Sequence, residues 1–110
     1  MARRGSIQSA PVIITTLGDS TVIPAQASGG IQVYGLFLFV NGNTVITFKN
    51  GTTALSGPCT VFGPPQQPIV PIIFPISEDA WFTVDAGNGF MIASDAAVDI
   101  QGTVYFTAGG

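Results

Sequence analysis

The 110-residue sequence contains no histidine and a single cysteine, Cys59. Histidine is the usual general base of nucleophilic triads and a common zinc ligand, so its absence excludes the most familiar acid-base and imidazole metal sites. One cysteine forms neither an internal disulfide nor a thiolate cage for a metal, and without histidine it lacks its usual activator. We expect Cys59 to be a small buried hydrophobic residue, and we expect no catalytic residue, no metal and no cofactor in this chain.

Charged residues are scarce, at 8% of the chain, whereas 46% of the residues are hydrophobic. An ordinary soluble domain carries about 25% charged residues. A monomer with so few charges solvates its surface poorly, so we expect part of that surface to be buried against copies of the chain or against a partner. Long apolar runs are also missing. The longest, at 33–40 and 69–76, are shorter than the roughly 18 residues of a membrane span, so no membrane partner is expected.

Basic residues are nearly confined to the N-terminus. Arg3 and Arg4 are two of the three positive residues, so the rest of the chain holds one lysine and six acidic residues. A body this acidic has no basic stripe to follow a phosphate backbone, and we expect no nucleic-acid partner. Residues 1–10 are interpreted as a basic arm, which either keeps the start of the chain soluble or docks on an acidic surface. The arm lacks the continuous apolar core of a signal peptide, which predicts a product that stays in the cytoplasm where it is made.

What the sequence does have is hydrophobic alternation with a period of two. Ile46 and Phe48 share one parity, and so do Ile100, Val104 and Phe106, as is typical of strands with one face in a core. Asn-Gly and glycine-rich turns separate such runs, and Asn41-Gly42 predicts a hairpin between the strands on either side of it. The pattern predicts one all-β domain over residues 11–110, an antiparallel, jelly-roll-like β-sandwich. About eight short strands are expected, near 11–17, 21–25, 35–40, 44–50, 69–75, 81–85, 90–92 and 98–107.

The strand at 35–40 is apolar on both faces, which a sheet with one side in water does not tolerate. One face is expected to fill the core, and the other to be covered by a loop or by a neighbouring copy. Trp81 is a further candidate for the self-interface, although packing within its own chain explains it equally well. The residues expected to form the core and the self-interface are Leu36, Phe37, Leu38, Phe39 and Trp81.

Prolines mark one strand and one loop. Pro71 and Pro75 share a parity, so both missing amides lie on the same side of their strand, which predicts a protected edge strand. Pro64 and Pro65 belong to an extended loop that is either a contact surface or only a connection.

Carboxylate chemistry has weak support. Asp85-Ala86-Gly87 resembles the active-site loop of aspartic proteases, but alanine stands where that family needs serine or threonine. A calcium site would draw its ligands from Asp85, Asn88, Asp95 and Asp99. Nothing like a spaced calcium-binding loop occurs around them, so we interpret these residues as solvated turn and strand positions.

Several blocks, taken in order, resemble a family of small proteins encoded among the virion structural genes of tailed bacteriophages. Each block alone is only a strand and a turn, so the specificity lies in their order and spacing. The blocks are Ile31–Leu38, Val45–Pro58, Trp81-Phe82-Thr83, Ala86–Gly89 and Val98–Tyr105.

The resemblance implies assembly and not catalysis. It implies a jelly-roll or related sandwich that forms a homotrimer and stabilises the head shell as a capsid decoration (cement) protein. The partners would be other copies and the major capsid protein or another virion protein, and the location would be the virion. Arg3, Arg4, Pro64 and Pro65 are the candidates for contact with the capsid. The alternative is a fibre or tail module that binds a receptor or carbohydrate, with Trp81, Tyr34 and Tyr105 as stacking residues.

Overall fold

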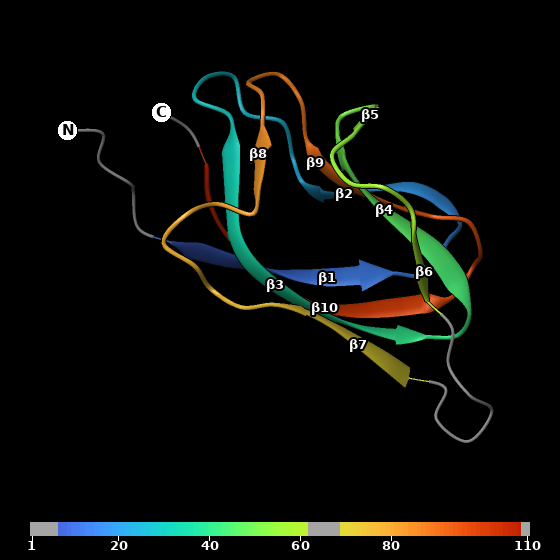
Figure 1. Cartoon of the computed structure of the whole chain (residues 1–110). Helices are drawn as coiled ribbons and strands as arrows, with labels where there is room; N and C mark the ends of the chain where they lie inside the picture. The colour runs from blue at the N-terminus through green and yellow to red at the C-terminus, as the bar shows by residue number, and fades with distance from the viewer. Residues whose placement is uncertain (1–6, 62–68, 109–110) are drawn as a thin grey trace.

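The computed structural model describes residues 7–61 and 69–108, which form ten β-strands and no helix (Figure 1). Within these residues, therefore, no helix is long and apolar enough to cross a membrane. The strands are β1 (Gln8–Ile14), β2 (Gly18–Ile23), β3 (Ile31–Asn41), β4 (Thr44–Asn50), β5 (Thr53–Ala54), β6 (Cys59–Val61), β7 (Ile69–Phe74), β8 (Phe82–Val84), β9 (Phe90–Ser94) and β10 (Asp99–Ala108).

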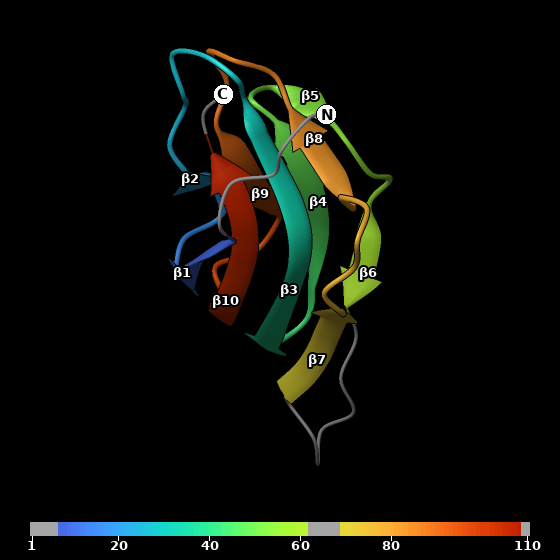
Figure 2. The same cartoon turned by 90° about the vertical axis from the view of Figure 1, so that its left-hand side faces the viewer.

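The strands form two antiparallel sheets that lie one against the other (Figure 1). In the view rotated by 90°, β10 and β3 lie in front of β9 (Figure 2). Sheet A has the order β1-β10-β3-β7, with β8 also paired to β3. Sheet B has the order β2-β9-β4-β5, with β6 also paired to β4. Early strands thus pair with late ones, as in a hairpin rolled into a jelly roll. The predicted fold class is confirmed, and the two strands that the sequence did not predict, β5 and β6, are short partners of β4.

Alternating side chains from both sheets fill the space between them. Leu36, Leu38 and Val40 of β3 point inward, as do Ile46 and Phe48 of β4, and each is at most 1% exposed. Burying a side chain of this size stabilises the fold by about 1.5–3 kcal/mol. The alternation predicted from the sequence is therefore confirmed as the packing of a single core.

Asn41-Gly42 does not close a hairpin, and the prediction that it does is wrong. β3 belongs to sheet A and β4 to sheet B, so this segment carries the chain between the sheets. A two-residue hairpin would make Leu38 and Val45 cross-strand partners, so their side chains would lie on the same face of one sheet. The inward residues on both sides of the turn are even-numbered, so only a crossing lets both sets face one core. Gly42 adopts φ of 132°, and a Cβ there would lie 2.7 Å from Val98 Cγ1.

The first part of β3 is covered on its outer side by the chain itself. β3 contains a bulge at Tyr34, which has no partner in the register with β10 and is 4% exposed. The backbone amide of Ser77 donates to the Tyr34 carbonyl at 3.0 Å, and a Cβ on Gly35 would lie 3.0 Å from the backbone of Ile76. The connection between β7 and β8 therefore covers β3 at the bulge.

Two of the three edge strands of sheet A, β1 and β7, contain a proline, and the third, β8, is only three residues long. β7 lies beyond β3 with Pro71 at its centre, which confirms the edge strand predicted from the prolines. β1, the opposite edge, contains Pro11. Because proline lacks an amide hydrogen, β1 and β7 are poor templates for another strand.

Two further expectations need correction. Cys59 is exposed, although its partner in the register, Ile46, is buried, because β6 pairs only with β4 and is open on its other side. The sheet also begins earlier than expected. Gln8 pairs with Phe106, so residues 8–10 belong to β1 and not to the predicted arm.

Candidate docking face

The outer face of sheet A carries apolar side chains from strands far apart in the sequence. The register sets them in two rows that run across β1, β10, β3 and β7. One row consists of Ile13, Gln101, Phe39 and Pro71, and the next of Pro11, Thr103, Phe37 and Ile73. The outward residue Tyr105 lies beside the second row. We call Pro11, Ile13, Phe37, Phe39, Pro71, Ile73 and Tyr105 the apolar face.

Much of the apolar face is open to solvent. Ile13 is 72% exposed, Ile73 is 62% exposed and Phe39 is 45% exposed, whereas the residues beside them in each strand are turned into the core. Scattered exposed apolar residues are normal, but contiguous apolar patches on soluble proteins mark interaction sites. The later half of β3 thus keeps its second apolar face uncovered within the described chain.

The aromatic rings of the face support one another. Phe37 and Phe39 meet edge to face, with ring centroids 5.7 Å apart and planes at 67°. Phe37 also lies 6.4 Å from the ring of Tyr105. Such edge and tilted pairs contribute about 0.5–1.5 kcal/mol beyond the area that they bury. The rings therefore form a fixed group and not three independent side chains.

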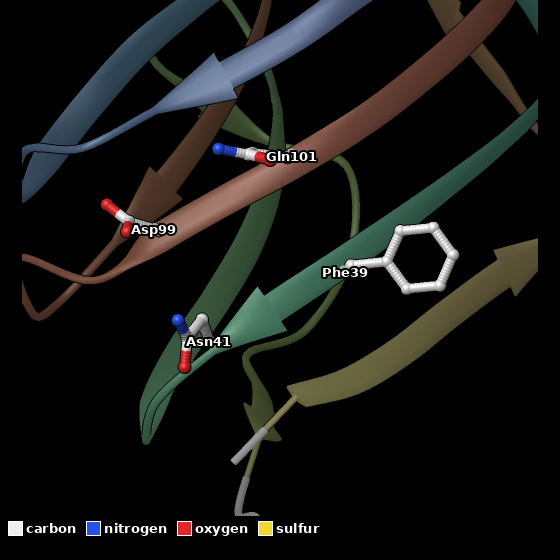
Figure 3. Close-up of a pocket in the computed structure, with 4 residues that line it drawn as sticks. All are labelled: Phe39, Asn41, Asp99 and Gln101. Carbon is white, nitrogen blue, oxygen red and sulfur yellow. The ribbon is translucent and has the colours of Figure 1, made fainter.

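A shallow hollow of about 100 Å³ lies beside Phe39 on this face. Phe39, Asn41, Asp99 and Gln101 line it, and all four are outward residues of β3 and β10 (Figure 3). The Phe39 ring extends toward the β7 side, whereas Gln101 and Asp99 extend toward the β1 side (Figure 3). Ligand pockets usually have about 300–1,000 Å³, so this hollow has room for one side chain and not for a cofactor.

The outer face of sheet B has a different chemistry. Its outward residues include Asp19 and Thr21 on β2 and Thr47 and Lys49 on β4. Lys49 Nζ lies 2.9 Å from Asp19 Oδ2, and this ion pair spans β9. No aromatic residue lies on this face among the described strands. Between β2 and β4, the outward residues of β9 are the half-buried Met91 and Ala93. The two outer faces therefore differ in that none of the large exposed hydrophobic residues lies on a described strand of sheet B.

Comparisons with known proteins give no relative for this chain. It matches no protein-family model, no curated protein and no solved structure. The interpretation of the apolar face consequently rests on the residues themselves.

The carboxylates considered for catalysis or calcium lie at two opposite ends of the sandwich. Asp85 accepts a hydrogen bond from Asn50 Nδ2 at 3.1 Å, and Asn88 donates to Asn50 Oδ1 at 3.0 Å, where β4 ends. Asp95 and Asp99 lie at the other end, where β4 and β10 begin. In the described part of the chain, no three His, Cys, Asp or Glu side chains gather as a metal site would require.

Asp95 has a structural task at that second end. The backbone amide of Val45 donates to Asp95 Oδ1 at 2.8 Å, and the Thr44 hydroxyl donates to the same oxygen at 2.9 Å. The hydrogen bond from the Val45 amide has the larger effect and that from the Thr44 hydroxyl the next, and both lower the pKa of this carboxyl from its ordinary value of 3.8. Thr44 also lies 2.7 Å from the buried Ser94 hydroxyl. The ionised carboxylate therefore holds the start of β4 against the end of β9.

The structure divides the residues that the sequence offered for the core and the self-interface. Leu36 and Leu38 are 1% and 0% exposed, so they belong to the core and offer no surface to another chain. Phe37 and Phe39 lie on the apolar face. The capsid-contact candidates Arg3, Arg4, Pro64 and Pro65 lie outside the described residues.

Trp81 packs within its own chain but keeps an open side. Its Nε1 donates to the Pro75 carbonyl at 2.8 Å, its ring stacks on Phe74 at 5.3 Å, and the residue is 46% exposed. Of the other two aromatic candidates for carbohydrate stacking, Tyr34 is buried and its hydroxyl donates to Gln32, while Tyr105 belongs to the apolar face.

Sequence reasoning missed most of the apolar face. Ile13, Ile73 and Pro11 lie in strands that it predicted, but as single outward residues they gave no signal of a shared surface. The signal is the register, because only the pairing of β1 with β10 and of β3 with β7 brings these residues beside Phe37 and Phe39.

Proposed function

We propose that this chain is a structural virion protein of a tailed bacteriophage, a homotrimeric capsid decoration protein that stabilises the head shell. The jelly-roll sandwich and the order of the sequence blocks support this family. The bulk of the chain is devoted to a rigid β scaffold, which suits a protein that has to be held on a particle.

The observation that carries the proposal is the contrast between the two outer faces. Sheet A presents Phe39, Ile13 and Ile73 to solvent, while sheet B presents an ion pair and threonines around the half-buried Met91 and Ala93. A chain with only 8% charged residues leaves such a face exposed only until another chain covers it. We assign the apolar face to self-association and the outer face of sheet B to the exterior of the assembly.

The contact with the shell is assigned to the basic N-terminal residues Arg3 and Arg4 and to the loop that contains Pro64 and Pro65. Deleting residues 1–6 should lower occupancy on purified heads, because two of the three positive charges of the chain are lost. Unchanged occupancy would move the shell contact to the proline loop.

The test of function is binding to heads that lack this protein, together with the mass in solution. The wild type should bind the heads saturably and show the mass of three chains by light scattering. The double variant Phe39→Gln/Ile73→Gln should become monomeric and lose occupancy, whereas Thr47→Gln on sheet B should behave as the wild type. A wild type that stays monomeric at micromolar concentration, or that ignores the heads, would sink the proposal.

A second candidate is carbohydrate binding on a fibre or tail, and Trp81 favours it. Its ring is fixed by Phe74 and by the Pro75 carbonyl yet remains 46% exposed, which is the arrangement that stacking on a sugar ring needs. Binding on a glycan array that is lost in Trp81→Ala would support this candidate. An empty array, with binding to heads retained by Trp81→Ala, would exclude it.

A further inference from the structure

Asparagine followed by glycine is a pair prone to a spontaneous change of the main chain. Three of the four asparagines of this chain, Asn41, Asn50 and Asn88, stand directly before a glycine. Glycine has no Cβ to hinder the approach of the preceding side chain, and asparagine is among the least heat-stable residues. The fold holds the three pairs in different ways, so it decides which of them reacts.

The reaction joins the side chain of the asparagine to the main chain that follows it. The backbone nitrogen of the glycine gives up its proton and bonds to Cγ of the asparagine, and the Cγ–Nδ2 bond breaks, so ammonia leaves with that proton. Water then opens the resulting five-membered imide at one of its two carbonyl groups, which gives aspartate or isoaspartate. The reaction therefore needs a free side-chain amide, a free glycine N–H and water, and no other reagent.

The pairs that begin at Asn50 and Asn88 hold each other where β4 ends. The Gly51 amide donates to the Gly89 carbonyl at 2.9 Å. Asn88 Nδ2 donates to Asn50 Oδ1 at 3.0 Å. Asp85 adds two bonds to Asn50, because its carboxylate accepts from Nδ2 at 3.1 Å and its backbone amide donates to Oδ1 at 3.4 Å. Both asparagines are half-buried and Gly89 is buried, so a reaction at either pair has to break these hydrogen bonds or admit water to a buried glycine.

Asn41 lies at the other end of the sandwich, as the last residue of β3. It is exposed, and its side chain makes no hydrogen bond to any residue that the structure describes. In Figure 3 its amide stands at the tip of β3, beside the open hollow that it helps to line. Gly42 follows it where the chain passes from sheet A to sheet B. Among the described residues, none of the side-chain bonds that hold the other two pairs has a counterpart at Asn41.

We propose that Asn41-Gly42 is a modification site, at which the native chain converts asparagine to aspartate and isoaspartate while Asn50 and Asn88 are preserved. In an unfolded chain the three pairs are equivalent, so the selectivity comes from the fold. Breaking one or two hydrogen bonds before the attack should slow the reaction at Asn50 and Asn88 by about tenfold or more. The reaction requires no partner, so it is independent of the proposed function.

The product places a second carboxylate beside Asp99. Asn41 and Asp99 are partners in the register of β3 and β10, and both line the hollow beside Phe39. Like charges directly opposite one another destabilise a pair of strands. Isoaspartate also adds a methylene group to the main chain where it passes from one sheet to the other. The change therefore makes this end of sheet A more acidic and less stable.

Trypsin makes the test direct, because it cuts after Lys49 and so separates Asn41 from the other two pairs. Peptide 5–49 carries Asn41, and peptide 50–110 carries Asn50 and Asn88. The wild type is kept at mildly alkaline pH, either folded in buffer or unfolded in guanidinium chloride, and mass spectrometry follows the conversion of amide to acid in each peptide. In the unfolded protein, 50–110 should change faster, since it carries two pairs. In the folded protein, 5–49 should change faster by about tenfold or more.

Two variants assign the change in 5–49, which also carries Asn43. Asn41→Gln should abolish it, because the longer side chain would have to form a less favourable six-membered ring, and Asn43→Gln should leave it unchanged. Conversion that survives in Asn41→Gln, or equal rates for the two peptides in the folded protein, would overturn the proposal.

Asn41→Asp reproduces the charge of one product and tests its effect on the fold. In low salt this variant should unfold at a lower concentration of urea than the wild type, and added salt should narrow the difference, because salt screens the repulsion from Asp99. Equal urea midpoints in low salt would refute the predicted loss of stability.

Discussion

Gly102 lies in the middle of β10, between β1 and β3, where the three strands come close together. A Cβ at this position would overlap the carbonyl oxygen of Phe37 and would lie 2.9 Å from its carbonyl carbon and 3.0 Å from Leu38 Cα. These are backbone atoms of a paired strand, so they cannot rotate away as a side chain does. Replacing Gly102 with alanine should therefore push β3 away from β10 at the centre of sheet A.

The size of the effect follows from what has to move. Overpacking a core costs about 1–3 kcal/mol, and more when the obstacle does not relax. Here the obstacle is backbone, and its displacement also weakens hydrogen bonds that are worth about 1 kcal/mol each. We expect Gly102→Ala to lower the free energy of unfolding by about 3 kcal/mol or more, a large share of the roughly 5–15 kcal/mol that holds a domain together.

Urea denaturation followed by the fluorescence of Trp81, the only tryptophan, measures this loss. Gly57→Ala is the matched control, because a Cβ there meets no heavy atom within 4 Å. That variant should be unchanged, or more stable by about 0.4–1 kcal/mol through its less flexible unfolded chain. If Gly102→Ala were as stable as Gly57→Ala, the close approach of β3 and β10 at this point would be refuted.

Three further predictions test other parts of the fold. Asp95→Asn should destabilise the protein at pH 7, and progressively less as the pH falls below about 4. The pKa of the Asp95 carboxyl is lower in the folded than in the unfolded state, so this group stabilises the fold above its unfolded-state pKa and loses that effect as it is protonated in acid. Equal differences between variant and wild type at pH 7 and pH 3 in urea titrations would contradict this. Gly42→Ala should cost about 1–3 kcal/mol, since its Cβ would lie 2.7 Å from Val98 at positive φ, and thermal unfolding would show it. The Cys59 thiol should react with a disulfide reagent in the native state as fast as in urea, and strong native protection would contradict its exposure.

The strands themselves were predictable because their signals are local. Ile46 and Phe48, or Val104 and Phe106, alternate with polar residues over a few positions, and that spacing alone requires a half-buried strand. The edge position of β7 was predictable for the same reason, since Pro71 removes its own amide hydrogen wherever the strand lies, whereas Pro75 follows the end of β7.

The Asn41-Gly42 turn shows where local signals end. The turn chemistry fits a hairpin, and a strand that is apolar on both faces allows one. The choice is made by which residues of β3 and β4 have to meet across the core, and that depends on both sheets at once. The exposure of Cys59 was mispredicted for a related reason, because its burial depends on whether another strand lies beyond β6.

The sequence by itself determined that the chain has no histidine, one free thiol and too little charge to solvate every surface, and it placed most of the strands. Only the tertiary structure decided where the uncovered apolar surface lies. Ile13, Phe39 and Ile73 are isolated outward residues in the sequence, and they become one surface because hydrogen-bonded register sets the neighbours of each strand. Register is a property of paired strands, and a single strand does not encode it.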